Sequence, residues 1–365
     1  MSRTDDALAI WKAALRQVDP RRAVREALRE VEGPWRVIAV GKAAPAMVAG
    51  ARDALGDRIV GGVLVHHVPA HDPVLLCLVG EHPLPGAGSL AAGRALMEEV
   101  AAHGRTTQVL GLWSGGASSL AELPTLPLDE LVAGTQQQMA AGVDIAALNA
   151  WRTARSQLKG GKLRRASAGQ WSNLVVSDVL GNDPALVGSG PGITDDAPGR
   201  VVLRLHDAVI GAEAEAWALR YATTVLSENV RGEAEEEGRR LAMAATLRLP
   251  GQPPMALIAA GEPVVTGLGE HPGGRMQHAA LAAVPELAGT DTTLLCVSTD
   301  GRDGPTDAAG ALVDGATLSR LEAAGIDVSR ALAERDSYRA LSAVGALVQG
   351  APTGTNVGDL MIALS

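Results

Sequence analysis

Aromatic residues and cysteines are scarce in this sequence. Phe is absent, aromatic residues make up 2% of the chain, and the only cysteines are Cys77 and Cys296. Because surfaces that stack nucleic-acid bases need exposed aromatic side chains, this composition argues against such a surface. Two cysteines far apart in the sequence also exclude a CxxC site and a disulfide framework. Both lie in apolar segments, so we expect each to be a buried free thiol.

The chain also lacks an excess of positive charge and long apolar runs. Its 41 acidic and 32 basic residues give a formal net charge of −9, which disfavours binding to nucleic acid or to anionic membranes. No apolar stretch reaches the roughly 20 residues of a membrane span. The N-terminal segment contains Asp5 and Asp6 and no apolar run typical of a signal peptide. We therefore expect a cytoplasmic protein without nucleic-acid or membrane partners, in which an anionic substrate needs a local basic pocket.

Short apolar runs alternate with amphipathic segments over most of the chain. We predict a helix at 5–31, with Leu8, Trp11, Leu15 and Val18 on one face, and further helices at 89–103, 128–147 and 231–248. We predict strands at 35–40, 61–65, 74–79, 108–113 and 173–176, and a strand with a helix within 200–227. Since strands that alternate with helices form parallel sheets covered on both faces, this order indicates an α/β fold.

The segment 249–254, with the sequence LPGQPP, interrupts this alternation. Its proline and glycine content is typical of a linker, and a new apolar strand begins at Met255. We therefore predict two domains, formed by residues 1–248 and 255–365.

Polar segments follow several of the predicted strands, where open α/β sheets bind their ligands. Lys42 follows the first strand and is either a cation for a carboxylate or phosphate or a solvated surface lysine. The sequence SGGASS at 114–119 forms either a nest for an anion or a glycine turn with a serine cap. The basic stretch with Arg152 and Lys159 is either an anion pocket or a solvated helix face. Asp178 ends a strand and either binds metal, acts in catalysis or caps a turn.

The last third of the chain contains three further glycine-rich segments. Glu262 follows the apolar run 255–260 and could bind a metal or a ribose. Arg275 follows two glycines and suits a phosphate oxygen, the alternative being a surface salt bridge. The carboxylate-rich run 300–307 forms either a Mg²⁺–nucleotide site or a series of tight turns, and its spacing is not that of an EF-hand. The third segment is 351–359.

In their order along the chain, these segments resemble the type II glycerate kinase family, whose members have a C-terminal MOFRL domain. The matching stretches are 41–44, 82–85, 114–116, 159–163, 177–179, 189–191, 261–262, 273–275, 299–301, 303–310 and 352–359. The resemblance implies a Rossmann-like N-terminal domain with a mostly parallel sheet, a smaller C-terminal MOFRL domain, and an active site in the cleft between them. It implies ATP-dependent phosphorylation of D-glycerate, typically to 2-phosphoglycerate, and allows for a homodimer.

The resemblance maps the family's catalytic lysine onto Lys42 and its active-site arginine onto Arg275. We add Asp178 as a third catalytic residue, and Asp178 and Asp300 as ligands of Mg²⁺. The expected substrate contacts are Ser114, Gly115, Gly116, Ser118, Arg152 and Lys159. The expected nucleotide contacts are Gly261, Glu262, Gly274, Thr299, Asp300, Asp303, Thr353 and Asn356. Because water would compete as phosphoryl acceptor, we expect the domains to close about the linker 249–254.

The chain departs from the family pattern at several positions near these motifs. They include Gly86, Ala154, Pro263, Met276 and His278. Several of these changes remove polar groups from the expected cleft, which leaves open a kinase for a related hydroxy acid or a non-catalytic ligand-binding relative. A hydroxypyruvate reductase is a further alternative, because some family members carry that name. It would need a G-x-G-x-x-G fingerprint after a strand, which the sequence lacks.

Overall fold

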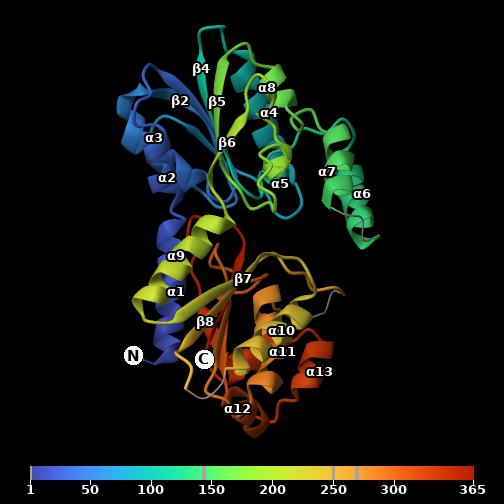
Figure 1. The fold of residues 1–365 in the computed structure, drawn as a ribbon. Helices are drawn as coiled ribbons and strands as arrows, with labels where there is room; N and C mark the ends of the chain where they lie inside the picture. The colour runs from blue at the N-terminus through green and yellow to red at the C-terminus, as the bar shows by residue number, and fades with distance from the viewer. Residues whose placement is uncertain (1, 142–144, 249–250, 268–270) are drawn as a thin grey trace. The chain divides into compact units, whose positions relative to one another are not determined.

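The computed structural model describes residues 2–141, 145–248, 251–267 and 271–365 (Figure 1). The chain divides into two compact units, each built on a six-stranded sheet. The parallel-sheet unit comprises Asp19–Arg204 and Gly354–Asn356. The mixed-sheet unit comprises Met1–Val18, Leu205–Thr353 and Val357–Ser365. None of the described helices combines the length and the apolar character that a membrane-spanning helix needs.

The sheet of the parallel-sheet unit has the strand order β3-β2-β1-β4-β5-β6, and every neighbouring pair is parallel. The strands are β1 (Trp35–Val40), β2 (Ile59–His66), β3 (Leu76–Val79), β4 (Gln108–Trp113), β5 (Gln170–Val176) and β6 (Gly199–Leu203). This is the order of doubly wound dinucleotide-binding folds. The predicted α/β fold with a Rossmann-like parallel sheet is thereby confirmed.

Helices cover both faces of this sheet (Figure 1). One face carries α2 (Pro20–Ala27) and α3 (Ala44–Leu55), and the other carries α4 (Ala87–Ala101) and α8 (Lys162–Arg165). The remaining helices of the unit are η1 (Gly56–Arg58), α5 (Ala117–Leu120), α6 (Leu128–Ala140), α7 (Ile145–Ala154) and η2 (Val187–Ser189). The predicted helix 128–147 therefore corresponds to two helices, with residues 142–144 outside the described part of the chain.

The mixed-sheet unit has the strand order β11-β10-β9-β12-β8-β7. Its strands are β7 (Ala222–Val230), β8 (Met255–Gly261), β9 (Thr293–Ser298), β10 (Ala308–Asp314), β11 (Leu347–Gln349) and β12 (Asp359–Leu364). Only β7 and β8 pair in parallel; the other neighbours are antiparallel. The helices α1 (Arg3–Gln17) and α9 (Leu205–Ala218) pack on one face, and α10 (Ala234–Thr246) and α11 (Arg275–Leu287) on the other. Three short helices, α12 (Thr317–Ala323), α13 (Val328–Ala333) and α14 (Ser337–Ala343), pack against α11.

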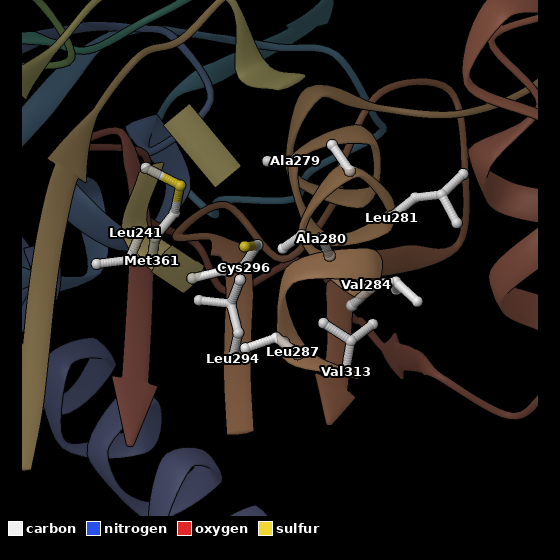
Figure 2. Packing of buried hydrophobic residues seen from close by; sticks show 14 of the residues in the cluster. Leu241, Ala279, Ala280, Leu281, Val284, Leu287, Leu294, Cys296, Val313 and Met361 are labelled. Carbon is white, nitrogen blue, oxygen red and sulfur yellow. The ribbon is translucent and has the colours of Figure 1, made fainter. Parts of the chain in front are cut away.

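Helix α11 is the centre of the mixed-sheet core, and its residues from Met276 to Val284 are all buried. Figure 2 shows its side chains beside residues of the strands, among them Leu294, Cys296 and Val313. Because many of its residues are alanine, the helix packs closely on the sheet without large aromatic side chains. Cys296 is buried as predicted, and burial raises the pKa of its thiol. Cys77 is only partly buried, since β3 is an edge strand.

The predicted helix 5–31 is two helices rather than one. Asp19 caps α2 by accepting hydrogen bonds from the backbone N–H groups of Arg21 (2.9 Å) and Arg22 (3.4 Å), and Pro20 occupies the first helical position. Proline is favoured at that position and disfavoured inside a helix, so the Asp-Pro pair starts a new helix. The change of unit falls at the same place, between Val18 and Asp19.

The division of the structure also differs from the predicted boundary between residues 248 and 255. Strand β7 pairs with β8, so the segment from α9 to α10 belongs to the mixed-sheet unit. The predicted hinge 249–254, of which 249–250 lie outside the described residues, is therefore internal to that unit. The chain passes between the units after Val18, Arg204, Thr353 and Asn356 instead. Sequence alternation alone does not show which sheet a strand joins.

Candidate active site

The turns after β1 and β4 meet where the strand order of the parallel sheet reverses. The backbone N–H of Lys42 donates to the carbonyl of Gly115 (2.9 Å), and that of Ala43 donates to Oγ of Ser114 (3.0 Å). A Cβ atom on Gly41, which has φ of +134°, would lie 2.1 Å from Oγ of Ser114. Only glycine therefore permits this approach. Ligands of doubly wound folds bind at this point of the sheet.

Asp178 follows β5, the strand next to β4, and lies against the same turn. A Cβ atom on Gly115 would be 1.9 Å from Oδ2 of Asp178 and 2.9 Å from Nδ2 of Asn356. Nδ2 of Asn356 donates a long hydrogen bond of 3.5 Å to Oδ2 of Asp178. The structure thus brings together three predicted site residues, one of them from near the C-terminus.

The second glycine of this turn lies against Lys42 and a histidine that the sequence did not single out. A Cβ atom on Gly116 would lie 3.1 Å from Cδ2 of His82 and 3.4 Å from Cγ of Lys42. His82 belongs to the family-like stretch 82–85, which was the available signal for it. The turn therefore forms a narrow backbone surface bordered by a lysine and an imidazole.

A chain of polar side chains extends this site on the side of α5. Oγ of Ser118 lies 3.1 Å from Oγ of Ser189, which in turn donates to Oδ1 of Asn149 at 3.5 Å. Ser118 was predicted as a substrate contact, whereas Ser189 and Asn149 were not. Ser189 lies in a family-like stretch, but no sequence signal distinguished Asn149 within its helix.

Arg152 lies one helical turn after Asn149 on α7. Its guanidinium makes no hydrogen bond or ion pair with any residue in the described part of the chain, and burial lowers its pKa although Glu122 opposes this shift. A partly buried cation without such a partner favours an incoming anion. The predicted role of Arg152 in substrate binding is compatible with this environment.

Lys159, which the resemblance predicts to contact substrate, lies in a buried ion pair. Its side chain is 1% exposed and forms an ion pair with Glu122, which also accepts a hydrogen bond from Oγ of Ser156 (2.5 Å). Burial lowers the pKa of Lys159, and Glu122 opposes that shift. An ion pair enclosed in this way contributes to the stability of the fold.

A second cluster surrounds Arg275 in the mixed-sheet unit. Nε of Arg275 pairs with Oδ2 of Asp359, the first residue of β12, and Nη1 donates to Oε1 of Glu262 at 2.8 Å. Burial opposes the charge, but Asp359 and Glu262 together raise the pKa of Arg275 above its ordinary value. Arg275 begins α11, Glu262 follows β8 and Asp359 begins β12, so the arginine is held where these two neighbouring strands meet the start of the helix.

Asp303 was predicted as a nucleotide contact, but it is 2% exposed and caps α11. Its carboxylate accepts hydrogen bonds from the backbone N–H groups of Met276 (3.1 Å) and Gln277 (2.7 Å). Burial raises the pKa of Asp303 to about 7, although the bond from Gln277 lowers it. The backbone amides of Met276 and Gln277 at the start of this helix are therefore bonded to a carboxylate. Gly274 is required here, since a Cβ atom would lie 2.1 Å from Oδ1 of Asp303.

Thr299 and Thr353 also have structural contacts in place of the predicted nucleotide contacts. Thr299 is fully buried; its Oγ1 donates to the carbonyl of Gly358 (2.7 Å) and accepts from the N–H of Val357 (3.0 Å). Oγ1 of Thr353 donates to the carbonyl of Thr299 (2.6 Å). These bonds fix the chain before β12 to the end of β9.

The predicted metal ligands Asp178 and Asp300 belong to different units. Asp300 is partly exposed and accepts from the N–H of Arg302 (2.9 Å) and from Oγ of Ser298 (3.1 Å). Among the described residues, no three or more His, Cys, Asp or Glu side chains are grouped so that they could hold a metal ion. Kinases commonly hold Mg²⁺ with one or two carboxylates and the substrate phosphates, and single exposed carboxylates suit that role.

A lysine beside a glycine turn, at the switch point of a parallel sheet, is typical of α/β proteins that bind an anionic ligand. Comparison with known proteins identifies its family. A domain of unknown function (DUF4147) matches residues 6–216, and the MOFRL family matches residues 255–359. A D-glycerate 2-kinase of Thermotoga maritima is 35% identical, covering 98% of this chain and 97% of the relative.

A glycerate 2-kinase of Pyrococcus horikoshii is 30% identical, covering 96% of this chain and 94% of the relative. The crystal structure of a glycerate kinase from T. maritima superposes with a TM-score of 0.88 at 33% identity, covering 99% of this chain and 98% of the other. The chain therefore belongs to the glycerate kinase family with a C-terminal MOFRL domain, as its motifs indicated.

The Lys159–Glu122 pair gives a first prediction. Lys159→Met should lower the free energy of unfolding by about 3–5 kcal/mol, because it leaves Glu122 buried without a counter-charge. The double variant Glu122→Gln/Lys159→Met should recover most of that loss. Urea unfolding followed by circular dichroism measures both. A raised KM with unchanged stability would instead restore Lys159 as a substrate contact.

The close approach of Gly115 to Asp178 gives a second prediction. Gly115→Ala should lower kinase activity about tenfold or more, because the new methyl group displaces the carboxylate of Asp178. Gly104→Ala is the matched control, since the nearest atom to its Cβ would lie 3.9 Å away. Kinetics and melting temperature of both variants are compared; equal activities would show that the position of Asp178 does not matter.

The pKa of Asp303 gives a third prediction. Between its unfolded value of about 3.9 and its folded value of about 7, the folded protein holds a proton that the unfolded chain releases, so stability falls as pH rises. Asp303→Asn does not titrate. Its free energy of unfolding relative to wild type should therefore increase by about 2–4 kcal/mol between pH 5 and pH 8. Urea unfolding of wild type and Asp303→Asn at each pH measures this change, and a constant difference between the two proteins would contradict the prediction.

Proposed function

We propose that this protein transfers the γ-phosphoryl group of ATP to D-glycerate and forms 2-phosphoglycerate. The observation that carries the proposal is the juxtaposition of the Lys42 and Gly115 turns with Asp178 at the switch point of the parallel sheet. The relatives named glycerate 2-kinase support the same substrate and product. Phosphoryl transfer requires positioned groups and neutralised charge, and these residue types supply both.

In this proposal the 2-hydroxyl oxygen of glycerate attacks the γ-phosphorus, and the bond from that phosphorus to the leaving oxygen of ADP breaks. Asp178 accepts the hydroxyl proton, and Lys42 neutralises charge on the phosphoryl group in flight. Arg275 contributes a second cation to the phosphates. Either Asp300 or Asp178 would hold Mg²⁺, which neutralises phosphate charge when bound, and Asp300 is the alternative acceptor of the proton if Asp178 holds the metal.

The substrate contacts that we propose are Ser114, Gly115, Gly116, Ser118 and Arg152, extended by Ser189. The guanidinium of Arg152 suits the glycerate carboxylate, and the hydroxyl pair of Ser118 and Ser189 suits the substrate hydroxyl groups. Gly261, Gly274 and Asn356 remain proposed nucleotide contacts. Lys159, Asp303, Thr299 and Thr353 are left out because their contacts are structural.

A hydroxypyruvate reductase is the second candidate, because the strand order of the parallel sheet is also that of dinucleotide-binding domains. The turn after β1 contains Gly41 and Lys42 but not the G-x-G-x-x-G fingerprint that binds a pyrophosphate. Tight binding of NADH, measured by its fluorescence, together with reduction of hydroxypyruvate would favour this candidate over the kinase.

The test is ADP release in the presence of D-glycerate, ATP and Mg²⁺, with the product identified by ³¹P NMR. Lys42→Ala should lower kcat about 100-fold or more, because the charge on the transferred group loses its counter-ion. Lys12→Ala, at an exposed position on α1, is the control and should keep wild-type kinetics. An inactive wild type, or an active Lys42→Ala variant, would contradict the proposal; a substrate panel would then distinguish another hydroxy acid from a protein that only binds.

A further inference from the structure

We propose that the two carboxylates that pair with Arg275 have different roles. Asp359 fixes the orientation of the guanidinium group. Glu262 covers the edge of that group to which a phosphate binds when the nucleotide is present. Asp359 is thus a positioning residue, and Glu262 is a resident competitor of the nucleotide. The inference rests on the proposed function, because that function supplies the phosphate ligand. It replaces the expectation that Glu262 itself binds the nucleotide.

The surroundings of Asp359 make its contact permanent. Its side chain is 1% exposed, and its backbone lies between β8 and β9, opposite Gly261 and Ser298. Its second oxygen, Oδ1, is buried without a hydrogen-bond partner among the residues that the structure describes. Burial raises the pKa of Asp359, whereas Arg275 opposes the shift. Since Arg275 is the counter-charge of a buried carboxylate, separating them is costly, and the direction of Nε is fixed.

The surroundings of Glu262 make its contact exchangeable. Its side chain is 47% exposed, and only its backbone is tied down, by a hydrogen bond from its N–H to the carbonyl of Val230 (2.9 Å). Ion pairs that solvent reaches in this way are weak. A phosphate carries more charge than a carboxylate and pairs with two guanidinium nitrogens at once, so it competes favourably for the same atoms.

The atoms that each carboxylate uses support this division. Asp359 takes Nε, which lies on the side edge of the guanidinium, whereas Glu262 takes Nη1, which lies on the end edge together with Nη2. Departure of Glu262 therefore exposes the end edge for a phosphate while Asp359 keeps the plane of the group in place. It also removes one negative charge from the approach of an anion. Neutralising Glu262 should consequently favour nucleotide binding.

The experiment compares Glu262→Gln with Asp359→Asn. Calorimetry with ADP should show that Glu262→Gln binds about two- to fivefold more tightly than wild type, the range expected for loss of a weak competing ion pair. Its KM for ATP should fall to a similar extent. Asp359→Asn should lower kcat at least tenfold and change KM far less. Glu334→Gln, which removes an exposed Arg–Glu pair with Arg330 on α13, is the matched control and should leave ADP affinity and kinetics unchanged.

Two outcomes overturn the inference. Weaker ADP binding in Glu262→Gln would mean that Glu262 helps to bind the nucleotide, and unchanged kcat in Asp359→Asn would mean that Asp359 does not position Arg275. If Asp359→Asn does not fold, Arg275→Lys is used in its place. A lysine ammonium group lacks the flat edge of two nitrogens that Glu262 covers in wild type. In that background Glu262→Gln should no longer tighten ADP binding, and persistent tightening would also overturn the inference.

ADP calorimetry needs no turnover, so it separates this inference from the proposed function. If wild type binds ADP but does not phosphorylate glycerate, the proposed function is wrong. The ADP affinities of wild type and Glu262→Gln then still decide whether Glu262 competes with the nucleotide. The reaction of Arg275 with phenylglyoxal, followed by mass spectrometry, gives a measure that does not depend on nucleotide. Glu262→Gln should react faster than wild type, since the end edge is uncovered, and an unchanged rate would count against the inference.

Discussion

The contact between the turns after β1 and β4 is the constraint on which the candidate site depends. These strands are neighbours in the sheet although Gln108 follows Val40 only after two further strands and the helices α3, η1 and α4. Their turns interlock because Gly41 has no side chain and Oγ of Ser114 accepts a hydrogen bond from the backbone N–H of Ala43. This contact fixes the backbone of Lys42 against that of Gly115. The carboxylate of Asp178 then occupies the space that a larger residue at position 115 would fill.

Exposure distinguishes the two kinds of cation in this protein. Lys159 and Arg275 are each paired with a buried carboxylate, and both were predicted to bind ligand. The ammonium group of Lys159 is enclosed, so its pair can only contribute to the fold. The guanidinium of Arg275 is larger and flat, and the Arg275 side chain is 32% exposed although its partner Asp359 is buried. A delocalised cation can thus be anchored at one edge and remain available at another, which a lysine cannot do.

The sequence was sufficient for the strands, the parallel α/β order and the loops that hold the site. Those features depend on local periodicity and on glycines next to apolar runs. It was not sufficient to predict which sheet β7 joins, because tertiary packing selects its partner strand. It was also not sufficient to predict the contacts of Asp303 and Thr299. Their residue types suit both a ligand and a helix or loop contact, and only burial separates the two. Asn149 had no local signal, because a polar residue in a helix is ordinary until Ser189 is placed beside it.

Several departures from the family pattern have explanations within the fold. Met276 and His278 are buried in the packing of α11, so those changes alter a core and do not remove ligand contacts. Near Gly86 the carboxylate of Glu81 accepts hydrogen bonds from the N–H groups of Gly88 (3.0 Å) and Ser89 (2.9 Å) at the start of α4. A Cβ atom on Gly86 would lie 2.5 Å from the side chain of Glu81, so glycine at position 86 makes room for this carboxylate. These positions therefore give no support to a ligand-binding relative without catalysis, and that alternative rests on Ala154 and Pro263.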